Sequence, residues 1–508
     1  MRFNWKLFVA TAVFALCISP TLVSYTPYSF NWDDSDYLWR SIAVSRAFWS
    51  GNSHAMRTAM VSIRPPVMTL LGLPWGPLAS WDAAGKCFIT LTAFTAFFAA
   101  LCLFLLLRVG LQFLYIVIAS ACVFAALGPF PVGSDVHSQA SGFMADSLFA
   151  WIAFAAVLLI PYEAASPASS TRGALVRGIL WAVILLTGAM TKVSFFYFIA
   201  LIVPALFAIR MRHSGLRSAF VALISLAICS VPAALYWLRY GLPALKNGLA
   251  ASFGHDAPFY YVPLSRFLSL TVRSSPGILL SLLVAIASIV YLVVKPRGIA
   301  WGTNILPLLI TIGYCAITFA SRNREIRFSF VGIIAPLFLI GILMSGKTLA
   351  VPRGSATIAA TLVFCFFAAA GVPMLRRSRR ESIARSEAVL AQAIDSNAKR
   401  VLLATDSSSL NDSLMKVAMA VSPSQPHVET GTLAWRAALG IPIESDFRDL
   451  RESDLIVFQS KEALDAPFTN QRVSEYEQYA RQLSSDAPTK VADDIRIYSV
   501  DHLPLRQP

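Results

Sequence analysis

The sequence predicts a polytopic α-helical membrane protein with about eleven transmembrane helices, followed by a small C-terminal α/β domain. Of the 508 residues, 56% are hydrophobic and only 14% are charged, and the mean hydropathy is +0.62. This leaves too little polar surface for a soluble globular protein. Apolar runs of about 17–22 residues recur over the first 375 positions, and each is long enough to cross a bilayer as a helix.

The first apolar run, residues 7–19, follows Arg2 and Lys6 and has no small-residue cleavage site after it. We therefore interpret it as an uncleaved first transmembrane span rather than a secretory signal peptide. The other predicted spans are centred near residues 97, 121, 153, 183, 201, 228, 286, 310, 337 and 364.

The charges agree with a cytoplasmic N-terminus. The predicted cytoplasmic loops carry Arg or Lys and one acid, Glu163, whereas the other eight acids of residues 1–375 fall on the outer side. The same parity places residues 376–508 outside, in the periplasm of a bacterial-type inner membrane. The basic cluster LRRSRRESIAR at residues 375–385 opposes this topology, unless it meets anionic lipid headgroups or one span is miscounted.

From about residue 385 the pattern becomes that of a soluble α/β domain. The runs VLLAT, DLIVFQS and IRIYSV predict strands, and SEYEQYARQL predicts a helix. Residues 376–508 contain 17 Lys and Arg against 19 Asp and Glu. This slightly acidic balance, without a basic patch, argues against nucleic acid as a partner.

The stretch NWDDSDYLWR after the first span concentrates three carboxylates, Asp33, Asp34 and Asp36. Part of this charge has a structural interpretation. If a helix starts near Ser35, Asp33 or Asp34 would cap it, and Asp36 would pair with Arg40 one turn later. The functional interpretation is a carboxylate held at the membrane surface as a general base or metal ligand.

The order DDSDY, FWSGN and IRPPVMTLLGLPW resembles the first outer loop of the C-type, polyprenyl-phosphate-dependent membrane glycosyltransferases. This superfamily includes the lipid A aminoarabinose transferase and the protein O-mannosyltransferases. The matching positions are Asp33, Asp34 and Tyr37, followed by Arg64 and the Pro65–Pro66 pair. The resemblance is specific over residues 26–210, weaker to about 345, and nearly absent in the C-terminal domain.

The resemblance implies roles for several of these residues. Asp33 or Asp34 would act as the catalytic carboxylate, with Asp146 as a further acid at the head of a span and Tyr37 in substrate binding. Arg64 and Lys192 would bind the lipid phosphate, for which an arginine fork is well suited. Each also has a structural alternative: Arg64 and Lys192 as interfacial anchors, and Asp146 as an acid favoured at a helix N-terminus.

Three further residues complete the predicted substrate site. Arg324 and Arg327 crowd a predicted outer turn, where the positive-inside rule disfavours cations. His255 lies in an aromatic outer loop, SFGHDAPFYYVPLSRF. A divalent metal bound by Asp33 and Asp146 is an additional hypothesis.

These features predict a membrane glycosyltransferase. It would move a sugar from a polyprenyl-phosphate donor to a lipid, glycan or protein acceptor on the outer face of the inner membrane, with inversion. The main alternative is a transporter or a lipid or glycan flippase, which would use the same charges as a substrate pathway. A structural membrane subunit would need neither Arg64 nor Asp33.

Overall fold

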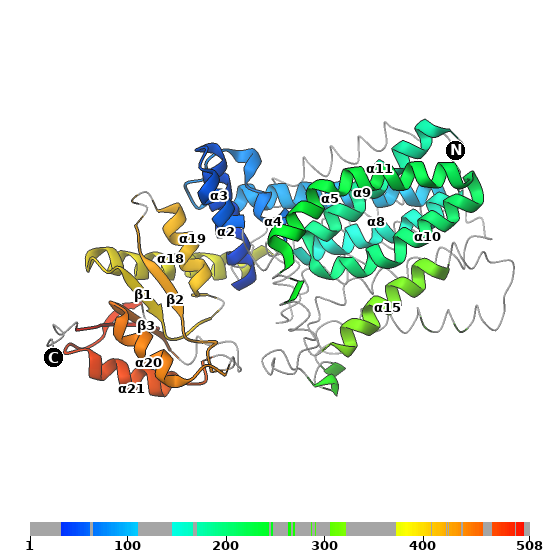
Figure 1. The fold of residues 1–508 in the computed structure, drawn as a ribbon. Helices are drawn as coiled ribbons and strands as arrows, with labels where there is room; N and C mark the ends of the chain where they lie inside the picture. The colour runs from blue at the N-terminus through cyan, green and yellow to red at the C-terminus, as the bar shows by residue number, and fades with distance from the viewer. Residues whose placement is uncertain are drawn as a thin grey trace.

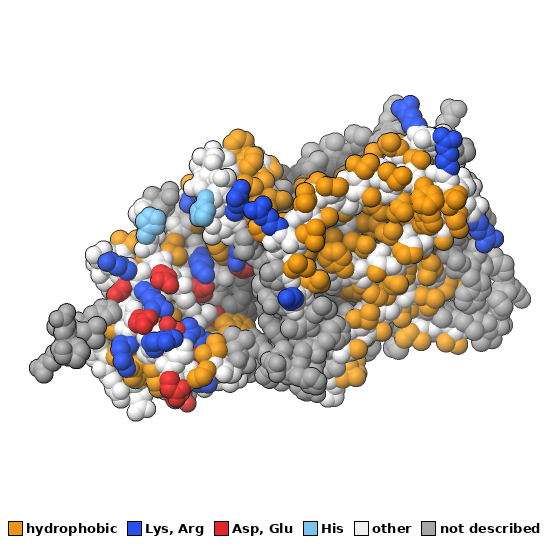
Figure 2. Space-filling view, in the orientation of Figure 1, with side chains coloured by type: hydrophobic (Ala, Val, Ile, Leu, Met, Phe, Trp, Pro, Cys, Tyr) orange, Lys and Arg blue, Asp and Glu red, His pale blue; other side chains and the backbone are white. Residues whose placement is uncertain are grey.

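The computed structural model describes residues 32–60, 65–109, 145–165, 170–242, 305–321, 372–407, 409–422, 426–437, 440–460, 470–492 and 494–501, with isolated positions at 245–246, 263–265, 268–269, 286, 290 and 424. These residues form a bundle of long helices and, at one end of it, an α/β unit (Figure 1). Short helices from the first part of the chain lie between the two. Hydrophobic side chains cover the bundle, whereas acidic and basic side chains intermingle on the α/β unit (Figure 2).

The bundle is built from long apolar helices. They are α5 (Asp82–Val109), α8 (Ala145–Ala165), α9 (Thr171–Thr191), α10 (Phe196–Ser214), α11 (Leu216–Tyr236) and the shorter α15 (Leu306–Ala320). Among the described residues, four segments are long and apolar enough to cross a membrane: Leu148–Ala165, Thr171–Thr191, Val193–Ser214 and Leu216–Gly241. Six predicted span centres, those near 97, 153, 183, 201, 228 and 310, fall within these helices. The remaining five spans lie wholly or mostly outside the described residues.

The helices pack closely because small residues lie between them. Gly178 of α9 faces α11, and a Cβ at this position would lie 2.3 Å from the Ala222 carbonyl oxygen. The two helices therefore approach at a distance that only glycine allows, as is common between transmembrane helices. Ser170 caps the start of α9 by accepting a hydrogen bond from the Gly173 amide at 3.1 Å.

The segment after the first predicted span, here called the α2–η1 segment, folds as α2 (Trp32–Trp49), α3 (Ser53–Met60), α4 (Val67–Leu70) and η1 (Leu73–Trp75). One face of α2 binds the loop around η1. The Gly72 amide donates to Ser41 Oγ at 2.9 Å, and Trp49 Nε1 donates to the Leu73 carbonyl at 2.9 Å. A Cβ on Gly72 would lie 2.8 Å from the Ser41 carbonyl oxygen, so this loop is fixed closely against α2.

The α/β unit has a five-stranded sheet with the order β2-β1-β3-β5-β4. The strands are β1 (Arg400–Leu403), β2 (Glu429–Thr432), β3 (Leu455–Gln459), β4 (Thr489–Ala492) and β5 (Ile495–Ser499). Strand β1 pairs in parallel with β2 and β3, whereas β5 is antiparallel to both β3 and β4. The three predicted strands are confirmed as β1, β3 and β5, and the predicted helix as α21 (Val473–Leu483).

Alternate residues of the strands face two separate apolar cores, as the period of two requires. Val401 and Val457 face the core under α18 (Val372–Asp395) and α19 (Asp412–Val421). Leu402 and Phe458 face the core under α20 (Ile443–Glu452) and α21. The basic cluster at residues 375–385 forms part of α18, the helix that leads into this unit.

The α/β unit also packs against the α2–η1 segment. Leu414, Val417 and Val421 of α19 are buried in the same apolar cluster as Tyr37 and Leu38 of α2. Trp81, next to the start of α5, donates a hydrogen bond from Nε1 to Glu387 Oε1 of α18 at 2.7 Å. Helix α2 and the start of α5 are thus joined to α19 and α18, which lie more than 300 residues later in the sequence.

Candidate functional site

The acidic stretch forms the first turns of α2. Asp33 and Asp34 are the second and third residues of the helix, which is described from Trp32 onward; the structure describes their backbone but not their side chains. The prediction that one of them precedes a helix starting near Ser35 is therefore wrong, because the helix already includes both. Both still lie in the first turn, where the helix dipole favours a carboxylate.

The third carboxylate has a structural role. Arg40 Nε lies 3.1 Å from Asp36 Oδ1, which confirms the predicted pairing one turn along the helix. Trp39 Nε1 donates to the same oxygen at 3.2 Å. Asp36 thus takes part in the local structure of α2. The catalytic roles of Asp33 and Asp34 stay predictions.

Tyr37 lies three residues after Asp34 and four after Asp33, so it shares their face of the helix. Its side chain is 7% exposed and belongs to the apolar cluster that α19 completes. The described contacts therefore make Tyr37 a residue that fixes α2 in place. Its predicted contact with substrate stays a prediction.

The Pro-Pro turn brings the next motif to α2. Pro66 is the N-cap of α4, and Thr69 Oγ1 donates to the Pro66 carbonyl at 2.7 Å. Helix α4 contacts both α2 and α9. Arg64 lies outside the described residues, but it directly precedes Pro65 in the chain. The chain therefore contacts both α2 and α9 from α4, which begins three residues after Arg64.

Lys192 ends α9 in an extended conformation, with φ −152° and ψ 134°. Its backbone amide donates to the Gly188 carbonyl at 3.0 Å, which fixes the last turn of the helix. Lys192 Nζ lies 5.4 Å from the centroid of the Phe149 ring on α8. This cation–π contact stabilises the lysine at the junction of α8 and α9.

Further aromatic residues surround this junction. The Phe149 ring packs against Phe195 at 5.8 Å and against Tyr314 of α15 at 5.8 Å. Tyr314 Oη and Ser194 Oγ are 2.9 Å apart. Sequence reasoning missed Phe149, Ser194 and Tyr314. Ser194 is two residues from Lys192 in the sequence, but Phe149 and Tyr314 lie on other helices, so their contacts depend on tertiary packing.

Asp146 is the second residue of α8, three residues before Phe149. Its backbone therefore lies one turn from the ring that Lys192 covers, on the same face of α8. The structure describes no side-chain contacts for Asp146. Placement at the first turn of a helix is as predicted from the sequence, and the catalytic role of Asp146 stays a prediction.

Three predicted substrate residues, His255, Arg324 and Arg327, lie outside the described residues. Among the residues that the structure does describe, no group of three or more His, Cys, Asp or Glu side chains is arranged to hold a metal ion. This search did not reach the side chains of Asp33 and Asp146, so the metal hypothesis attached to them stays a hypothesis.

The opposite end of the bundle contains a buried ion cluster. Glu163 of α8 and Arg210 of α10 are both 1% exposed, and Arg210 Nη1 lies 2.8 Å from Glu163 Oε2. Trp181 Nε1 and Arg177 Nη1 also approach Glu163 Oε1, at 3.1 and 3.5 Å. Arg210 completes its own bonding with Ser218, through Nη2 to Oγ at 3.0 Å. This cluster ties four helices together, α8 to α11.

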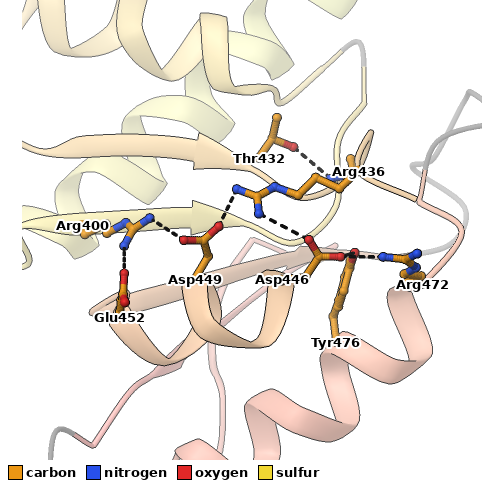
Figure 3. Close-up of polar contacts among 9 residues, drawn as sticks. Arg400, Thr432, Arg436, Asp446, Asp449, Glu452, Arg472 and Tyr476 are labelled. Carbon is orange, nitrogen blue, oxygen red and sulfur yellow. Dashed lines mark hydrogen bonds and ion pairs between the residues drawn. The ribbon is translucent and has the colours of Figure 1, made fainter. Parts of the chain in front are cut away.

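The α/β unit contains a second ion network, far along the chain from these motifs (Figure 3). Asp446 is fully buried and accepts hydrogen bonds from Arg472, at 2.8 Å, and from the Tyr476 hydroxyl, at 2.5 Å. Arg436 bridges Asp446 and Asp449. All the carboxylates drawn there have protein partners, which indicates a network that fixes α20 rather than a binding site.

Comparison with known proteins identifies the fold. No protein-family model matches the sequence, and no curated protein matches it. The structure of ArnT from Cupriavidus metallidurans bound to undecaprenyl phosphate superposes with a TM-score of 0.57 at 12% identity, over 97% of both chains. Two structures of an oligosaccharyltransferase from Archaeoglobus fulgidus align less well. The apo form has a TM-score of 0.46 at 12% identity. AglB with an inhibitory peptide and a dolichol-phosphate has a TM-score of 0.45 at 11% identity. Both alignments cover 90% of this chain and 70% of the other.

The similarity to ArnT extends over nearly the whole of both chains, including the C-terminal α/β unit that the sequence resemblance did not cover. The predicted resemblance to the C-type glycosyltransferases is thereby confirmed at the level of the fold. At 12% identity the comparison defines a fold class of membrane proteins and no individual substrate.

Proposed function

We propose that this protein is an integral membrane glycosyltransferase. It would move a sugar from a polyprenyl-phosphate donor to a hydroxyl of a lipid, glycan or protein acceptor on the outer face of the inner membrane. The observation that carries the proposal is that α4, which directly follows the Pro-Pro turn, contacts both α2, which begins with the acidic stretch, and α9, which ends at Lys192. The fold of ArnT, whose structure holds undecaprenyl phosphate, supports the choice of donor.

The reaction would be a single displacement. Asp33 or Asp34 takes the proton of the acceptor hydroxyl, whose oxygen attacks the anomeric carbon of the sugar. The bond between that carbon and the phosphate oxygen breaks, and its electron pair stays with the departing polyprenyl phosphate. Attack from the face opposite the leaving group inverts the anomeric centre.

Cations stabilise the leaving phosphate in this mechanism. Lys192 is placed at the end of α9 by a fixed backbone turn and by the Phe149 ring. Arg64, next to the turn that contacts α9, would supply a planar fork to the same phosphate. Positive groups positioned before the reaction begins are effective because they need not reorganise as negative charge develops.

A divalent metal would fit the chemistry of this site only through carboxylate oxygens, which hard cations prefer. Asp33 and Asp146 would be the residues to hold it, and it would neutralise phosphate charge when bound. The proton transfer and the displacement described above use the chain's own residues and do not depend on such an ion.

The proposal is tested by incubating purified protein, in lipid nanodiscs, with a panel of radiolabelled polyprenyl-phosphate sugars and envelope acceptors. Wild type should transfer label from at least one donor. Asp33→Asn should fold normally and lose at least about 100-fold in rate, the contribution expected of a general base.

Asp36→Asn is a matched control, because it removes a carboxylate from the same stretch but one already paired with Arg40. It should transfer at close to the wild-type rate. Transport of the lipid across the bilayer without sugar transfer would instead identify a flippase. Near-normal turnover by both Asp33→Asn and Asp34→Asn would remove the acidic stretch from the mechanism.

A further inference from the structure

A groove runs between the α2–η1 segment and the α/β unit. It has a volume of about 390 Å³ and is bordered on one side by α2 and the start of α3, and on the other by α19. Its lining combines the aromatic ring of Trp39 with two cations, Arg46 and Lys416, one from each side. Figure 2 shows Lys and Arg side chains gathered around α3, at the boundary between the apolar bundle and the polar unit.

Arg46 has unused bonding capacity. Its Nε donates to the Leu78 carbonyl, but its Nη2 atom is buried and has no hydrogen-bond partner in the described part of the chain. Burial also lowers the pKa of this guanidinium. The Arg46 side chain also lines the groove, so its guanidinium presents positive charge to a ligand bound there.

Lys416 provides the second charge from α19. Its Nζ donates to Asp412 Oδ2 at 2.6 Å and lies 5.8 Å from the centroid of the Trp39 ring. An ammonium has three donors, so the bond to Asp412 leaves two for a ligand. The side chain is 35% exposed, which keeps it accessible from the groove.

The position of the groove restricts the ligand. Trp39 and Arg46 are five and twelve residues beyond Asp34 on the same helix, which corresponds to about 8–18 Å along the axis. A ligand bound there would be too far away to be the reacting group itself. It could be part of the same acceptor molecule, whose hydroxyl reaches the start of α2.

We propose that this groove binds a phosphate group of the acceptor, remote from the hydroxyl that receives the sugar. The inference rests on the proposed function. Two cations from opposite walls favour a phosphate, which carries more negative charge than a carboxylate and has more acceptor oxygens. The acceptor would then be a phosphate-bearing glycan or glycolipid, and the α/β unit would form part of its binding site through Lys416.

The test measures the thermal stabilisation of the full-length protein, in phosphatidylcholine nanodiscs, by inorganic phosphate at constant ionic strength. The Arg64→Gln/Lys192→Gln background removes both cations of the proposed donor phosphate site. Phosphate should stabilise this protein, and adding Lys416→Gln or Arg46→Lys should raise the phosphate concentration required by about tenfold or more, as expected for loss of a charge-assisted hydrogen bond.

Arg57→Gln and Lys490→Gln are matched controls, because each removes an exposed cation from α3 or the α/β unit without lining the groove. They should bind phosphate as the background does. Equal phosphate dependence in the groove and control variants would overturn the proposal. Lys416→Gln changes a partly exposed side chain, so it keeps the test decisive if the Arg46 variant fails to fold.

Two further arms identify the source of the phosphate. Competition between a soluble hexose phosphate and inorganic phosphate for the groove would support a phosphate on an acceptor glycan. Stabilisation only by phosphatidylglycerol nanodiscs would assign the groove to a membrane headgroup and overturn the acceptor assignment. The outcome is separable from the proposed function. If the groove variants alone lose phosphate binding but the wild-type protein transfers no sugar, the groove is a phosphate site and the proposed transferase function is wrong. If the wild-type protein transfers sugar but the groove binds no phosphate, the transferase function stands and the groove proposal is wrong.

Discussion

The two ends of the long helix α8 use charge in different ways. At its C-terminal end, Glu163 is enclosed by Arg210, Arg177 and Trp181, so this carboxylate is bonded within the protein. Near its N-terminal end, about 21 Å away by helix rise, Lys192 lies over the ring of Phe149. We call these the Glu163 end and the Lys192 end.

The difference indicates what each end is for. A carboxylate enclosed by hydrogen-bond donors has its bonding capacity used, so the Glu163 end fixes how four helices pack. The Lys192 end instead carries the cation to which we assign a role in binding the donor phosphate. Helix α4, which follows the Pro-Pro turn, contacts both α2 and α9. In the proposed mechanism, structural charge and reactive charge therefore lie at opposite ends of the helix bundle.

The largest expected effect concerns the side of the membrane on which the Lys192 end and the α/β unit lie. We expect alkaline phosphatase fused after Pro508 to be fully active, because the enzyme folds only outside the cytoplasm and the predicted parity places the C-terminus there. A fluorescent protein exported unfolded and fused at the same point should be dark. An inactive phosphatase with a bright fluorescent fusion would reverse the assignment of the two ends.

The Glu163 end should be the more sensitive to loss of charge. Glu163→Leu leaves Arg210 buried without its carboxylate, and we expect a loss of about 3–5 kcal/mol in the free energy of unfolding. The double variant Glu163→Leu/Arg210→Met should recover much of this, because no buried charge is left unmatched. Unfolding by titration with sodium dodecyl sulfate measures both.

Arg212→Gln provides the control for this end, since Arg212 is an exposed cation on the same helix as Arg210. It should unfold like wild type. If Glu163→Leu were no less stable than Arg212→Gln, the cluster would not be structural and the contrast between the ends would fail.

Parts of this contrast could be predicted from the sequence and parts could not. The Asp36–Arg40 pair follows from helical spacing, and the strands β1, β3 and β5 follow from short apolar runs. The Glu163–Arg210 pair joins residues 47 positions apart, so only the packing of α8 against α10 brings them together. Local pattern likewise places Asp146 at a helix start but cannot show that Phe149, one turn later, supports Lys192.

The smallest expected effect lies in the α/β unit, where ion pairs are more exposed. Burial acts to raise the pKa of Glu477, but the hydrogen bond from Arg481 and the charge of Arg496 outweigh it, and the pKa is lowered. A lowered pKa in the folded state stabilises the protein above the unfolded pKa of about 4.3, and this contribution is lost as the pH falls through the folded value.

Glu477→Gln should therefore cost at most about 1 kcal/mol at pH 7, the range of partly exposed pairs. The difference from wild type should shrink as the pH falls from about 5 to 3, measured from the thermal unfolding of the full chain at each pH. A difference that stays constant over this range would show that the ion pairs of Glu477 do not contribute through its charge.

The account depends most directly on Arg64 and Lys192 binding one phosphate at the Lys192 end. The decisive measurement is a double-mutant cycle of Arg64→Ala and Lys192→Ala on the transfer rate, with varied donor and saturating acceptor. Residues that share a ligand should couple by about 0.5–3 kcal/mol, and Arg64→Lys should weaken donor use because the planar fork is lost. Strictly additive effects, with Arg64→Lys behaving like wild type, would contradict the account and reduce both residues to membrane anchors.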